Sequence, residues 1–213
     1  MNLKHAAVLF VALLPLAGHA GTIRSEVRQD LAEARAEVRA DLARERARLE
    51  TENLSLGHLH FGNDGRREAK REQALPEGAI TPGGELRVDG KTLATDAAQR
   101  RMLLDYRAQV IDIARTGIDA GERAAILAID ATDVPVWRMV AGAMTGSLER
   151  RVESAVLREI KPALLQICQR LPHLRDAQQA IAASLPAFRP YATLQADDVA
   201  DCERDLGREF ATR

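Results

Sequence analysis

The chain has 213 residues, of which 46% are hydrophobic and 29% charged, and its formal net charge is −1. This composition is too apolar for a wholly disordered chain, and the balanced charge excludes binding of nucleic acid through bulk electrostatics. Aromatic residues make up only 3%, which argues against base-stacking or sugar-binding aromatic surfaces. The sequence predicts a mainly α protein, a helical bundle with a small β-hairpin element and a long charged N-terminal helix.

Residues 1–20 have the pattern of a secretory signal peptide. A basic start at Lys4 precedes an apolar run over residues 6–16, and small residues precede a predicted cleavage before Gly21. The apolar run is about half as long as a membrane span. We therefore expect an exported chain without a transmembrane segment in its mature form; an uncleaved N-terminal anchor is the alternative.

Residues 21–52 are predicted to form a long charged helix. More than half of the side chains from Arg24 to Glu52 are charged, and neither glycine nor proline occurs among them. A narrow apolar stripe repeats mostly every three, four or seven residues and comprises Ile23, Val27, Leu31, Ala34, Val38, Leu42 and Leu49. The stripe fits a coiled-coil seam for self-association or a protein partner, or a helix lying on the main domain. A solvated helix without a partner is the alternative.

Residues 53–94 are predicted to contain short strands, a linker and a hairpin. Residues 53–61 alternate with a period of two, which is typical of a strand. Residues 66–77 are rich in charge and read as a linker. Within a small β-element over residues 80–93, the dipeptide Asp89-Gly90 is the strongest hairpin-turn signal in the chain.

Two groups of side chains could bind a metal ion. His58 and His60 would share one face of the first strand, where imidazoles can ligate zinc or copper, but a site needs further ligands. Two surface histidines are the alternative. The acidic cluster between Asp197 and Asp205 is explained better by the dipole at a helix N-terminus than by ion binding. We expect no cofactor.

Residues 95–213 are predicted to form a helical domain of four or five helices. The first helix is expected to start at a Thr95 cap and to end near Thr132. Further expected features are a helix over about 136–160, a kink or restart at Pro162, a helix that Pro172 closes, a short helix over 174–185, an extended connector over 188–191, and a last helix capped by Asp197.

The chain has two cysteines, Cys168 and Cys202. Because exported proteins meet an oxidising compartment, an even pair favours a disulfide bond, which would contribute roughly 3–4 kcal/mol through loop closure. Two separately buried thiols are the alternative. A redox-active cysteine is less favoured, since no C-x-x-C motif occurs.

Catalytic motifs are missing from the sequence. No serine lies in G-x-S-x-G, and neither a phosphate loop nor a dinucleotide-binding glycine pattern occurs. We therefore expect a non-enzymatic interaction or scaffolding protein. The alternative is a small-molecule or metal-binding protein, or an enzyme of unrecognised type, with a pocket near Tyr106, Trp137 and Tyr191.

A series of ordered motifs spans about residues 53–202. They include ITPGGEL at 80–86, VDGK at 88–91, LDYRAQV at 104–110, CQRLP at 168–172 and LPAFRPYA at 185–192. Together they resemble the YggN-like family of proteobacterial exported proteins. The resemblance implies a Gram-negative periplasmic protein in which Cys168 and Cys202 belong to the shared pattern. It implies no activity, and it does not cover the charged helix before Asn53.

Overall fold

The computed structural model describes residues 19–57, 75–132 and 147–211. Within these ranges the chain forms four α-helices and one four-stranded antiparallel sheet, which confirms a mainly α fold with a small β-element. Several predicted features lie outside the described residues, namely most of the signal peptide, His58 and His60, nearly all of the linker, Trp137 and the start of the second helix of the helical domain.

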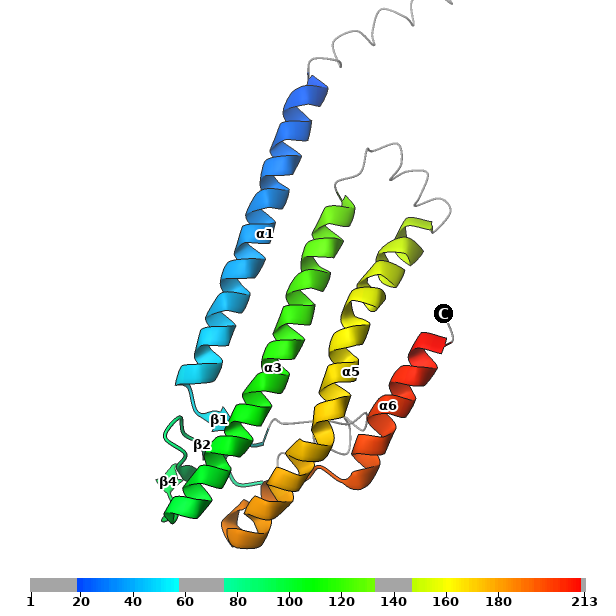
Figure 1. Cartoon of the computed structure of the whole chain (residues 1–213). Coiled ribbons are helices and arrows are strands. Elements are labelled where there is room, and N and C mark those ends of the chain that lie inside the picture. Colours follow the sequence, from blue (N-terminus) through cyan, green and yellow to red (C-terminus); the bar gives the residue numbers. More distant parts are fainter. Residues whose placement is uncertain (1–18, 58–74, 133–146, 212–213) are drawn as a thin grey trace, which may run out of the picture.

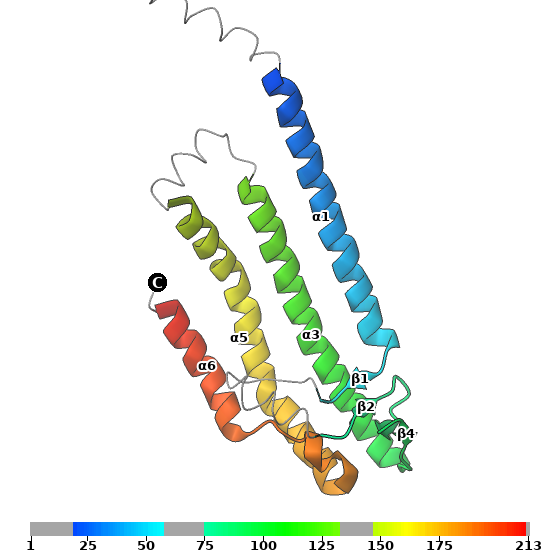
Figure 2. The same cartoon turned by 180° about the vertical axis from the view of Figure 1, so that it is seen from behind.

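The four helices lie side by side in a row (Figures 1 and 2), in the order α1 (His19–Thr51), α3 (Ala97–Thr132), α5 (Ser147–Ser184) and α6 (Ala196–Ala211). Each helix packs against its neighbour in the row, and neighbours run in opposite directions. In both views the N-terminal end of α1 extends past the end of α3. The sheet lies where α1 ends and α3 begins.

The sheet is a meander with the strand order β1 (Leu54–Ser55), β2 (Gly78–Ile80), β3 (Leu86–Val88) and β4 (Lys91–Thr92). The predicted turn joins β3 to β4: Asp89 and Gly90 have φ values of 48° and 75°, the left-handed pair that a tight hairpin requires. A second turn, at Gly84 with φ 77°, is closed by a 2.9 Å hydrogen bond from its N–H to the carbonyl of Thr81.

Helix α3 starts one residue later than predicted, because Asp96 rather than Thr95 caps it. The Asp96 carboxylate accepts hydrogen bonds from the N–H groups of Ala98 and Gln99, both at 2.8 Å. In return, the Gln99 side chain accepts a 3.0 Å bond from the Asp96 N–H. This reciprocal capping box satisfies backbone donors in the first turn of α3 and at Asp96 itself.

Helix α5 runs through both prolines, Pro162 and Pro172, so the prediction that Pro172 ends a helix is wrong. Each proline removes one backbone hydrogen bond, but buried side chains on the same helix, among them Cys168, Leu171 and Leu174, favour continuation. The expected extended connector is also wrong. It is a 3₁₀ helix, η1 (Pro186–Tyr191), whose Phe188 and Tyr191 are buried.

One hydrophobic core joins the sheet to the helices. It combines Ile80 and Leu86 of the sheet with Leu103 and Tyr106 of α3, and it continues through Leu171 and Leu174 of α5 to Phe188 and Tyr191 of η1. The sheet and the helical region therefore share their packing. Among the side chains that the structure describes, none from α1 belongs to this core.

Candidate functional site: the α1–α3 interface

Helix α1 turns one face towards α3. Its half-buried side chains follow the predicted stripe and include Leu31, Ala34, Val38, Leu42 and Leu49, with mostly exposed positions between them. Val27 differs from them, because it is 44% exposed. The described stripe therefore has a half-buried segment from Leu31 onward and an exposed position at Val27.

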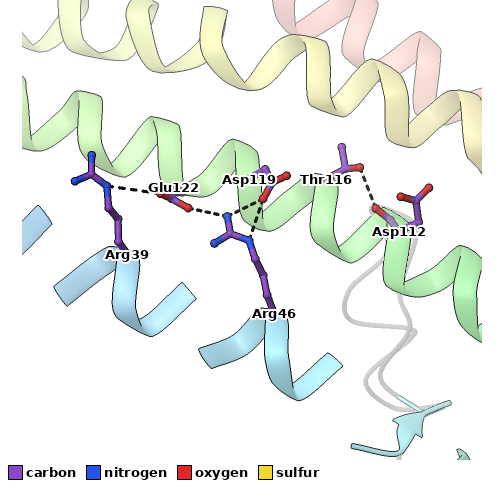
Figure 3. Close-up of polar contacts among 6 residues, drawn as sticks. All are labelled: Arg39, Arg46, Asp112, Thr116, Asp119 and Glu122. Atoms are coloured by element: carbon purple, nitrogen blue, oxygen red, sulfur yellow. Dashed lines mark hydrogen bonds and ion pairs between the residues drawn. The ribbon is translucent and has the colours of Figure 1, made fainter. Parts of the chain in front are cut away.

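Arginines of α1 form ion pairs with acidic side chains on α3 (Figure 3). Arg46 donates to Asp119 and Glu122, each at 2.6 Å, and Arg39 lies 3.8 Å from Glu122. Nearer the end of α3, Arg35 pairs with Asp130 at 2.7 Å. The hydrogen bonds that Arg46 donates to Glu122 and then to Asp119 raise the pKa of its guanidinium.

The sign of the pairing reverses near the C-terminal end of α1. There the acidic partner belongs to α1 and the basic one to α3, since Glu50 pairs with Arg115. On the other side of α3, Arg170 of α5 pairs with Asp112 at 2.9 Å and donates to the Thr116 hydroxyl at 2.8 Å. Acidic groups of α3 are thus bound by arginines from both neighbouring helices.

Arg107 holds the last turn of α1. The residue is 6% exposed, and its Nη2 donates to the carbonyl oxygens of Leu49, Glu50 and Glu52 at 2.8, 3.1 and 2.8 Å. The final carbonyls of a helix have no partner within the helix and carry partial negative charge. The buried cation of α3 supplies both the missing donors and the matching charge.

The interior near Tyr106 and Tyr191 is packed, not open. Both rings contact Phe188 edge to face, at centroid distances of 5.6 and 6.1 Å. The buried amide of Gln178 donates to the Tyr106 hydroxyl at 3.2 Å and to the Tyr191 carbonyl at 3.0 Å, and it accepts from the Leu194 N–H at 2.9 Å. These contacts hold Gln178 and the two tyrosines against one another in the described part of this region.

Hollows occur elsewhere on the described surface. One of about 470 Å³ lies over α3, with Ile126 and Leu127 in its lining and Arg39 and Glu159 from the flanking helices. Its charged lining is engaged within the chain, as in the 2.7 Å pair between Arg123 and Glu159. Another, of about 500 Å³, lies beside the sheet. Neither hollow is lined by the tyrosines that the sequence singled out.

The predicted disulfide bond is confirmed, because Cys168 of α5 and Cys202 of α6 are joined with an S–S distance of 2.00 Å. It links the last helix to its neighbour in the row. No helix in the described ranges has the length and apolarity to cross a membrane. A disulfide bond is compatible with a secreted protein.

Over the described ranges, no cluster of three or more histidine, cysteine, aspartate or glutamate side chains has the geometry of a metal site. The pair His58 and His60 lies outside these ranges. The last helix begins at Ala196, so Asp197 lies within its first turn and is not the N-cap that the sequence predicted. Asp198, also in the first turn, accepts a 2.7 Å bond from the N–H of Gln195, the residue before the helix.

Comparisons with family models, with curated proteins and with solved structures give no match to this chain. The resemblance to the YggN-like family therefore remains a prediction. The candidate site is the interface between α1 and α3, where several ion pairs join two described helices.

Sequence reasoning found the stripe of α1 but missed the charges that hold it. The sequence showed these charges only as members of two charged helical segments: Arg35 and Arg46 in one, and Asp119 and Asp130 in the other. A signal was present, however: the two arginines are eleven residues apart, and so are the two aspartates. Arg107 gave no such signal, since a single arginine in a helical pattern does not reveal which carbonyls it will reach.

Proposed function

We propose that this protein is an exported, periplasmic, non-enzymatic interaction module that works through helix α1. The signal-peptide pattern of residues 1–20, the disulfide bond and the YggN-like motifs support export to an oxidising compartment. The even charge balance and the missing catalytic motifs favour binding over chemistry.

The observation that carries the proposal is the position of α1. This helix contributes no described side chain to the buried core, and its N-terminal end reaches beyond α3 with Val27 exposed on the apolar stripe. An apolar position at the end of a charged helix is the seam through which one helix pairs with another. The partner is a helix of another protein or of a second copy of this chain.

The experiment compares two substitutions that each add one carboxylate to α1. Val27→Asp places it on the exposed part of the stripe, whereas Ala36→Asp places it at an exposed position on the opposite side of the helix. Because neither side chain belongs to the core, both variants are expected to fold. Sedimentation velocity of the disulfide-bonded protein measures the assembly.

We expect the wild type and Ala36→Asp to sediment as the same oligomer. The Val27→Asp oligomer should dissociate at a protein concentration at least about tenfold higher than the wild-type oligomer does, because a charge in an apolar seam costs more than about 1.4 kcal/mol. Equal sedimentation of all three proteins would contradict the use of this seam in self-association. If all three are monomers, crosslinking in periplasmic extract should capture a partner with the wild type and Ala36→Asp but not with Val27→Asp.

A further inference from the structure

The ion pairs between α1 and α3 share one antiparallel register. Arg35 meets Asp130, and eleven residues further along α1, Arg46 meets Asp119, eleven residues back along α3. Eleven residues make about three helical turns, or about 16 Å. The two arginines therefore lie on one face of α1, and the two aspartates lie on one face of α3. The two helices are therefore matched in the spacing of their charges.

The reversed pair fixes the direction of the helix. Four residues beyond Arg46, Glu50 meets Arg115, which lies four residues before Asp119. A helix laid on α3 in the opposite direction would bring Glu50 towards the acidic end of α3 and Arg35 towards Arg115. Repulsion between like charges at these positions would oppose the reversed direction. The acidic surface of α3, formed by Asp119, Glu122 and Asp130, therefore selects an antiparallel helix with this order of charges.

The contacts that hold α1 are made by side chains of α3. They are Arg107, Arg115, Asp119, Glu122 and Asp130. Most of these ion pairs are partly exposed, with 25–55% of the side-chain surface accessible in the pair of Arg35 and Asp130. Exposed ion pairs are individually weak and are screened by salt, so the helix is held by charges that can exchange with the same charges of another molecule.

We propose that the acidic surface of α3 binds α1 of a second copy of this chain, so that two copies exchange their N-terminal helices. The second copy carries the same arginines and the same reversed pair, and its Leu49, Glu50 and Glu52 carbonyls fit Arg107 equally well. Only two residues, Glu52 and Asn53, separate α1 from β1. Such short connections favour the exchange of a terminal element between protomers.

This exchange rests on the proposed function, since it names the partner of α1 as α3 of a second copy. The test uses two variants of the full, disulfide-bonded chain. The helix variant carries Arg35→Glu and Arg46→Glu, and the surface variant carries Asp119→Lys, Glu122→Lys and Asp130→Lys. In either variant alone, like charges face each other across α1 and α3, within the chain and between copies.

Mixing the two variants restores both interfaces, but only between different chains. The acidic α1 of the helix variant fits the basic α3 surface of the surface variant. The native α1 of the surface variant fits the native α3 surface of the helix variant. Native mass spectrometry at low ionic strength distinguishes the two masses. We expect the 1:1 heterodimer to exceed either homodimer by at least about tenfold, a ratio that corresponds to 1.4 kcal/mol.

A chain that carries all five substitutions is the matched control, because its own helix and surface are again complementary. We expect it to behave as the wild type does. If the mixture stays as two separate monomers while this control matches the wild type, α1 binds α3 only within one chain and the exchange is refuted. A wild type that self-associates in spite of that result would leave the proposed function standing; a wild type that neither self-associates nor captures a partner would refute it.

Discussion

Arg107 is the residue on which the position of α1 depends most. Its guanidinium donates to two carbonyl oxygens in the last turn of α1 and to that of Glu52, just after the helix. A carbonyl group that loses its partner in a half-buried position costs about 1–3 kcal/mol. The same residue also links the core to α1, because its neighbour in sequence, Tyr106, is fully buried among the core residues.

We predict that Arg107→Met loosens the end of α1. Hydrogen exchange of the amides over residues 45–52 should accelerate at least about tenfold, the factor that corresponds to 1.4 kcal/mol. Arg101→Met is the matched control, since Arg101 is an exposed arginine of the same helix. If both variants show the exchange rates of the wild type in these residues, Arg107 does not anchor α1.

Tyr106 makes the free energy of unfolding depend on pH in the alkaline range. Burial raises the pKa of its phenol from 10.0 to about 12, although the hydrogen bond from Gln178 opposes the shift. The unfolded chain therefore releases this proton first, and the stabilisation that is complete below pH 10 is lost as the pH rises towards 12.

We predict that the free energy of unfolding falls more steeply with pH in the wild type than in Tyr106→Phe. Between pH 10 and pH 11 the free energies should diverge by about 1 kcal/mol, because the unfolded tyrosine is only partly ionised at the start of this interval and one full proton corresponds to about 1.4 kcal/mol per pH unit. Urea unfolding at several pH values measures it. Parallel curves for the two proteins would show that Tyr106 ionises as readily in the folded state as in the unfolded one.

At the scale of elements, α6 depends on its disulfide bond. It packs against α5 at the end of the row, and Cys202 joins it to Cys168, 34 residues earlier in the chain. A loop of that length stabilises the folded state by about 3–4 kcal/mol in the chain-entropy model.

We predict that replacing both cysteines by alanine lowers the free energy of unfolding by about 3–4 kcal/mol and that the amides of α6 lose protection first. Hydrogen exchange resolves α6 from α5, and wild type reduced under native conditions should give the same pattern. Uniform loss of protection over α3, α5 and α6 would show that the bond stabilises the core as a whole rather than the last helix.

The elements that the sequence predicted well are those set by neighbouring residues. The turn at Asp89 and Gly90 needs only two residues that tolerate positive φ, and the stripe of α1 needs only helical spacing. The continuity of α5 through Pro172 was missed, because packing with distant elements outweighs the local cost of proline. The register of α1 on α3 likewise depends on charges far apart in the chain.

At the scale of the whole molecule, two parts have different chemistry. The sheet, η1 and the adjoining parts of α3 and α5 share one apolar core. Helix α1 lies beside that core and is joined to it through Arg107 and through ion pairs with α3. The proposed exchange of α1 would therefore leave the side chains of this core in place.

The most direct test is a native mass spectrum of the protein purified unreduced from the periplasm of a Gram-negative host. We predict a dimer whose subunits begin at Gly21, lack two hydrogens each because of the disulfide bond, and carry no small molecule. A monomer that carries a stoichiometric small molecule would contradict the account, because the protein would then act by binding a ligand rather than another helix.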